Sequence, residues 1–190
     1  MYVDESTARD YLMMCAVIAN EHVARTRRVM RSLLKPSQKG LHMKDEKRRA
    51  REILGAIVSV EPTVVIFKCR REVPDLEARE RCVQRLSFEA CEADLSRVVL
   101  DPIESLVRRD LSWIYAGARA AGHAEPPFEF GHQQRHEEPL MWIADAAGWA
   151  WQRGGVLRKQ ITPVVRAIAC NARNPTPRAS VRVSGSLLGR

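Results

Sequence analysis

The chain has 190 residues, 45% of them hydrophobic and 28% charged, which is typical of a globular protein and excludes a fibrous or wholly disordered one. Its formal net charge of +8 and its pI of about 9.7 favour polyanionic partners such as nucleic acid. The most apolar run, residues 139–151, is shorter than the about 20 residues that cross a bilayer and contains an acid, so we expect no membrane span.

The cysteines and the first residues predict a cytoplasmic protein. None of the five cysteines belongs to a Cys-x-x-Cys pair, and most stand in apolar surroundings, which predicts buried thiols in a reducing compartment. Asp4 and Glu5 occupy the region where a signal peptide would carry its basic start and apolar run.

The first part of the chain alternates strand-like and helical patterns. Val23, Met30 and Leu33 recur at helical spacing, and Pro36 lies beyond them to end the helix. The run Thr63–Cys69 is β-branched and apolar, as in a buried strand. In chain order we predict a strand hairpin at 2–4 and 10–19, helices at 21–34 and 45–59, and a strand at 63–69.

The second part continues the alternation, and Pro139 suits the first turn of a helix, where its missing N–H is harmless. We predict helices at 75–95 and 104–121, strands at 97–101 and 127–132, a helix from Pro139, and a last helix at 157–170. Residues 1–170 then form one domain. Residues 171–190 are rich in Pro, Ser and Arg, and we predict a basic, disordered tail.

Basic residues gather in two segments that flank an acidic middle. Residues 22–51 contain eleven Lys or Arg and two acids. Arg27, Arg31 and Lys35 recur every four residues, opposite the apolar stripe of their helix. Such a face is either simply solvated or follows a phosphate backbone, and the lack of acids on it favours the second interpretation. We predict nucleic-acid contacts at Arg27, Arg31, Lys35, Lys44, Lys47, Arg48 and Arg51.

Asp145 stands in the most apolar helix, where an ionised carboxylate is costly unless it is paired or binds a cation. Glu138 lies seven residues earlier, two helical turns away. Asp101 ends a predicted strand, and Asp4 ends the first strand. If these four acids converge, their oxygens suit Mg²⁺ or Mn²⁺, the cations used for in-line phosphodiester cleavage.

Each acid also has an ordinary interpretation that the sequence leaves open. Asp145 could pair with a buried Arg or His, or cap a backbone amide. Asp101 precedes Pro102 and could be a turn residue. Asp4 could be a plain hairpin acid, and Glu138 could favour the dipole of the helix that follows it.

Four short motifs together resemble the DUF3800 family: "MYVDES" at 1–6, "LHMKDE" at 41–46, "VVLD" at 98–101 and "HEEPLMWIADAAGWAW" at 136–151. The resemblance implies a ribonuclease H-like fold over most of residues 1–165. It also implies that Asp4, Asp101 and Asp145 are metal ligands, with Glu138 as a fourth acid. His42 matches a family position that would contact a phosphate or orient a water. Thr7 stands where the family usually has Gly, and Pro102 follows Asp101.

We therefore expect an α/β protein with a ribonuclease H-like mixed sheet of about five strands and helices on both faces. Its expected function is that of a metal-dependent nuclease (a hydrolase) acting on RNA or DNA through Asp4, Asp101, Glu138 and Asp145. The alternative is a catalytically silent module on the same fold that binds nucleic acid or a protein. In that case the Trp-rich helix, with Trp142, Trp149 and Trp151, could also join two copies of the chain.

Overall fold

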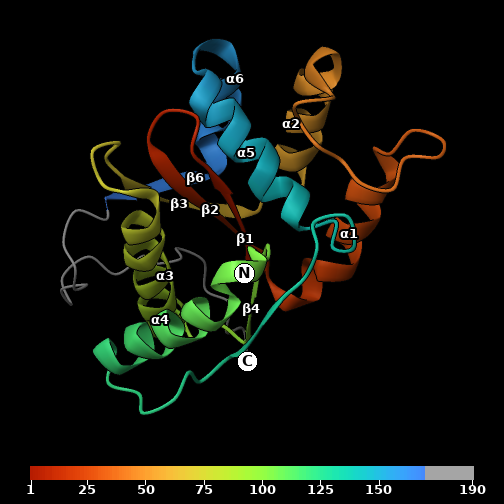
Figure 1. Ribbon diagram of the computed structural model, residues 1–190. Coiled ribbons are helices and arrows are strands. Elements are labelled where there is room, and N and C mark those ends of the chain that lie inside the picture. Colours follow the sequence, from red (N-terminus) through yellow and green to blue (C-terminus); the bar gives the residue numbers. More distant parts are fainter. Residues whose placement is uncertain (170–190) are drawn as a thin grey trace.

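A six-stranded mixed sheet with helices on both faces forms the centre of the computed structural model, which describes residues 1–169 (Figure 1). The order across the sheet is β5-β4-β1-β2-β3-β6. The expected α/β class is confirmed. The predicted tail at 171–190 lies outside the described residues. The strands are β1 (Tyr2–Ser6), β2 (Tyr11–Val17), β3 (Thr63–Cys69), β4 (Arg97–Leu100), β5 (Glu129–His132) and β6 (Val165–Ala169).

The first three strands form an antiparallel meander, and three parallel pairings complete the sheet. β1 pairs with β2 and β2 with β3 in antiparallel register. β4 is parallel to β1, β5 is parallel to β4, and β6 is parallel to β3. Because successive side chains of a strand point to opposite faces, Tyr2 and Asp4 belong to one face of β1, and Val3 and Glu5 belong to the other.

One face of the sheet is covered by α1 (Val23–Ser32), α2 (Ala50–Ser59), α5 (Met141–Arg153) and α6 (Gly155–Ile161). Helix α5 lies close to the sheet because Gly148 has no side chain. A Cβ there would come within 2.7 Å of Met14 Cε. Trp142 of α5 is among the largest fully buried side chains of this core. The close approach of α5 brings Asp145 down to the level of the strands.

The other face is covered by α3 (Asp75–Glu92) and α4 (Val107–Ala120), which pack against each other (Figure 1). Gly117 is required at their crossing, because a Cβ there would lie 2.2 Å from the backbone oxygen of Gln84. Apolar residues at helical spacing, such as Cys82, Leu86 and Ile114, fill the space between these helices and the sheet.

The two largest differences from the predicted elements concern the last helix and the second helix. The last helix is wrong beyond Ile161, where α6 ends and a short 3₁₀ turn at Thr162–Val164 leads into β6. Pro163 cannot continue an α-helix, and the β-branched residues after it suit a strand. The sheet therefore has six strands rather than five. The second helix begins at Ala50 rather than near Asp45, because a 3₁₀ turn at Lys47–Arg49 precedes it.

The thiols are buried as predicted, as far as the structure describes them. Cys15, Cys69, Cys82 and Cys91 are buried in the core between the sheet and helices α3 and α4, and Cys170 lies outside the described residues. Within residues 1–169, no helix combines the length and the apolar character needed to cross a bilayer.

Candidate functional site

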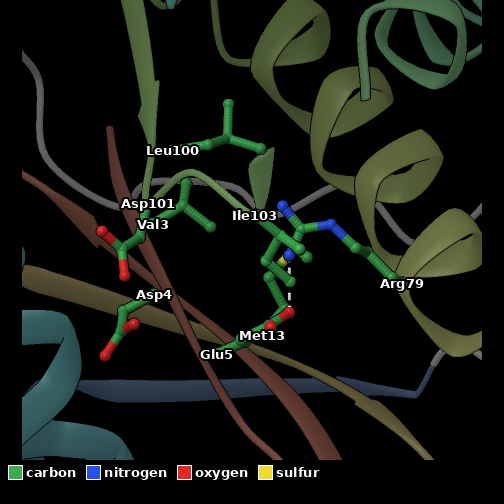
Figure 2. Close-up of a pocket in the computed structure, with 8 residues that line it drawn as sticks. All are labelled: Val3, Asp4, Glu5, Met13, Arg79, Leu100, Asp101 and Ile103. Atoms are coloured by element: carbon green, nitrogen blue, oxygen red, sulfur yellow. Dashed lines mark hydrogen bonds and ion pairs between the residues drawn. The ribbon is translucent and has the colours of Figure 1, made fainter. Parts of the chain in front are cut away.

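Asp4 and Asp101 lie side by side on neighbouring parallel strands. Asp4 is the middle residue of β1 and is only 6% exposed. Asp101 directly follows β4, and its backbone N–H donates to the carbonyl of Val3 at 3.1 Å. Val3 pairs with Leu100, so the next residues of both strands, Asp4 and Asp101, point to the same face. Figure 2 shows both carboxylates on the same side, with Glu5 turned away from them.

Asp145 approaches the same place from helix α5. Its Oδ2 accepts the backbone N–H of Met43 at 2.9 Å, and it lies 3.2 Å from Nδ1 of His42. The loop before α2 therefore caps this carboxylate from one side. The sequence had left open whether Asp145 pairs with His or Arg or caps a backbone amide, and the structure contains all of these contacts. The hydrogen bond that His42 makes to Asp145 raises the pKa of His42.

Arg135 connects the three aspartates. It lies in the loop between β5 and α5, and its Nη1 is 3.5 Å from Asp145 Oδ1 and 3.7 Å from Asp4 Oδ2. Its backbone N–H donates to Asp101 Oδ1 at 3.2 Å. Three carboxylates from β1, from the end of β4 and from α5 therefore contact one residue. The sequence interpretation did not include Arg135, which is one charge among many in a polar loop.

Burial and mutual repulsion dominate the electrostatics of this group. Burial, followed by the charge of Asp145, raises the pKa of Asp4 to about 7, against the opposing effect of Arg135. Burial also raises the pKa of Asp101. The nearby guanidinium therefore compensates only part of the negative charge, and the group favours an additional proton or an additional cation.

Glu138 is directed elsewhere. It accepts hydrogen bonds from Arg27 Nε at 3.0 Å and from Arg27 Nη2 at 2.6 Å, while Arg27 Nη2 also donates to the hydroxyl of Tyr2 at 3.3 Å. Helix α5 begins only at Met141, so the seven-residue separation of Glu138 and Asp145 does not span two full helical turns. The structure pairs Glu138 with Arg27 and places it in a different contact group from the three aspartates.

The predicted basic surface is divided. Arg27 is occupied by Glu138, and Lys35 Nζ is 2.8 Å from Glu46, a buried acid whose pKa Lys35 lowers. The basic face predicted at Arg27, Arg31 and Lys35 therefore does meet acids. Glu138 comes from a distant part of the chain, and Glu46 comes from the nearby segment before α2. The remaining predicted contacts are exposed: Arg31, Lys44, Lys47, Arg48 and Arg51. His42 is partly exposed beside Asp145.

A second charged group lies beyond the opposite face of β1. Arg79 of α3 makes two hydrogen bonds to Asp110 of α4, at 2.9 and 2.8 Å, and a third to Glu5 at 2.6 Å. His132 Nε2 is 2.9 Å from the same Asp110. A pocket of about 20 Å³, enough for about one water molecule, lies between Arg79 and Asp101 (Figure 2).

The donor chemistry of the three aspartates fits Mg²⁺ or Mn²⁺, because both ions prefer carboxylate oxygens. Their arrangement is not that of a finished site, however. Among residues 1–169, no group of three or more His, Cys, Asp or Glu side chains is arranged to hold a metal ion. Asp4, Asp101 and Asp145 would have to close around the ion, and the Arg135 side chain would have to leave.

The comparisons with known proteins add no relative. A scan against protein-family models, a search of curated proteins and a search of solved structures each found no match.

Proposed function

We propose that the chain is a metal-dependent nuclease with a ribonuclease H-like fold of the DUF3800 type, acting on RNA or DNA. The observation that carries the proposal is the convergence of Asp4, Asp101 and Asp145 on Arg135. The mixed sheet with helices on both faces is what the resemblance implies, and it supports the proposal at the level of the fold.

The three aspartates would hold Mg²⁺ or Mn²⁺, with the Met43 N–H and His42 orienting Asp145. When bound, the ion would activate water and stabilise the charge on the leaving oxygen. His42, which is partly exposed beside Asp145 and whose pKa is raised by the hydrogen bond to Asp145, would face a phosphate of the substrate. The substrate backbone would lie along the exposed basic residues of the loop before α2 and of α2 itself, including Lys44, Lys47 and Arg51.

Cleavage assays test this function directly. Labelled single-stranded, double-stranded and hybrid substrates are incubated with Mg²⁺, Mn²⁺ or EDTA. We expect cleavage with metal, none in EDTA, and a loss of at least about 100-fold in Asp145→Asn, since an electrostatic stabiliser of the transition state is typically worth that much.

Asp94→Asn is the matched control. Asp94 is exposed, precedes β4 at the end of that strand away from Asp101, and has a positive φ of 48°, which Asn tolerates. It should cleave like the wild type. If no substrate is cleaved, or if Asp145→Asn cleaves normally, the three aspartates are not a nuclease centre.

A catalytically silent binding module is the second candidate. It is favoured by Arg135, which already partly neutralises the acids, and by the absence of a preformed metal group in residues 1–169. In such a module Arg31 and the exposed basic residues near α2 would still bind nucleic acid. On the Trp-rich helix, Trp142 is buried and could not contact a second copy of the chain. Trp149 and Trp151 are partly exposed and would be the contact residues.

A further inference from the structure

The Arg135 side chain is held loosely. One nitrogen, Nη1, serves both Asp4 and Asp145, at 3.7 and 3.5 Å. Charge-assisted hydrogen bonds between nitrogen and a carboxylate are normally about 2.7–2.9 Å long. The side chain is also 32% exposed, so water competes for its guanidinium. These contacts are those of a counter-ion that can leave without breaking a strong hydrogen bond.

The backbone of Arg135 is held firmly in contrast. Its N–H donates to Asp101, and its carbonyl accepts the indole N–H of Trp142 at 2.7 Å. Trp142 is 1% exposed and lies on α5, the helix that carries Asp145. The loop is therefore fixed to the acid-bearing elements at the peptide of Arg135, and the guanidinium can swing away while the loop stays in place.

The space between Asp4 and Asp145 suits only one cation at a time. A divalent ion binds carboxylate oxygens at about 2.0–2.1 Å, much closer than Arg135 does, and carries twice its charge. Three carboxylates beside one guanidinium leave an excess of negative charge that such an ion would neutralise better. A guanidinium and a metal ion between the same two oxygens would repel each other.

We infer that Arg135 is a built-in competitor of the divalent cation: its guanidinium occupies the metal position between Asp4 and Asp145 in the free protein and must move out before the ion binds. This inference rests on the proposed metal site. Its consequence is a metal affinity that is lower than three aspartates would otherwise give, since each binding event must displace an internal positive charge.

Manganese binding to the full chain tests the inference, measured by calorimetry or by the spin resonance of free Mn²⁺. We expect Arg135→Gln to bind Mn²⁺ roughly tenfold more tightly than the wild type, since a unit charge at this distance and exposure is worth about one decade. Arg135→Lys, which keeps the charge, should stay near the wild type. Arg108→Gln, an exposed site on α4 with the same charge change, should be within about twofold.

The outcomes separate the two proposals. If the wild type does not bind Mn²⁺, or if Asp145→Asn binds it equally well, the metal site itself fails. If binding depends on Asp145 but Arg135→Gln binds equally or more weakly, the metal site stands and the competition is wrong. If Arg135→Gln does not fold, Arg135→Met removes the same charge with a different neutral side chain. Mn²⁺ binding by Arg135→Met that is equal to or weaker than that of the wild type would again show that Arg135 does not compete with the ion.

Discussion

Arg79 and Arg135 both meet more than one carboxylate, but in opposite ways. Arg79 is 4% exposed, and three of its nitrogens donate, at 2.6 to 2.9 Å, to Asp110 and Glu5. Arg135 is 32% exposed and reaches two carboxylates through one nitrogen, at 3.5 and 3.7 Å. The first arrangement is closed and saturated, whereas the second is open and leaves negative charge uncompensated.

The aspartates of the two groups respond accordingly. Burial would raise the pKa of Asp110, but hydrogen bonds from His132 and Arg79 outweigh it and lower that pKa. Burial and the charges of Asp145 and Asp101 raise the pKa of Asp4 to about 7, and the guanidinium of Arg135 only partly opposes this shift. A fully compensated buried charge stabilises one arrangement of helices, while an under-compensated one is suited to bind something else.

Breaking the closed group should have the largest effect. Arg79→Met removes two of the hydrogen bonds to Asp110, which is 0% exposed, and leaves only His132 beside it. Breaking a buried ion pair by removing one partner typically costs about 3–5 kcal/mol. We expect that loss in the free energy of unfolding, measured by urea denaturation in EDTA. Arg119→Met, on the exposed side of α4, should change it by less than about 0.5 kcal/mol. Equal losses in the two variants would show that the buried network around Arg79 adds no more stability than an exposed arginine does.

The open group should reveal itself in the pH dependence of stability. Between about pH 4 and about pH 7 the folded protein retains a proton on Asp4 that the unfolded chain has released. The free energy of unfolding should therefore fall as pH rises through this window, by roughly 2–4 kcal/mol in total.

Asp4→Asn isolates this contribution from those of other acids. Urea denaturation in EDTA from about pH 5 to about pH 8 should show a flatter profile for Asp4→Asn than for the wild type, because the proton exchange is gone. Asp94→Asn should keep the wild-type slope, since Asp94 is exposed. Parallel profiles for Asp4→Asn and the wild type would mean that Asp4 is already ionised in the folded protein.

The smallest effect is expected for Asp145→Asn in EDTA. The variant loses a weak ion pair with Arg135 and the charge that meets His42, but it also relieves repulsion of Asp4. The Asn oxygen can still accept the Met43 N–H. We expect a change within about 1 kcal/mol in urea denaturation. A loss of about 3 kcal/mol or more would instead make Asp145 a structural partner like Asp110.

The same sequence rule identified Asp145 and could have identified Arg79 and Asp110. A charge on the apolar stripe of a helix must find a partner or a ligand. Arg79 precedes Cys82, Val83 and Leu86 at that spacing, and Asp110 likewise precedes Trp113, Ile114 and Gly117. Their helices are rich in other charges, which hid this signal in the sequence.

Other features had no local signal. Arg135 and Glu138 both lie in the polar run between β5 and α5, and their partners Asp4 and Arg27 lie far away in the chain. The error at β6 has a different origin: residues 157–170 read as one apolar pattern, although Pro163 divides them into a helix and a strand. The strands and most helices were predictable because hydrophobic periodicity is local, whereas ion pairing is set by tertiary structure.

The three aspartates come from elements that are remote in sequence, and this affects the kinetics of folding. The β1–β2 hairpin is built from local pairings, but it contains only Asp4. Asp101 arrives when β4 pairs with β1, and Asp145 arrives when α5 docks on the sheet. A ligand held by all three is absent from any partly assembled chain, so it slows unfolding and leaves the rate of folding unchanged.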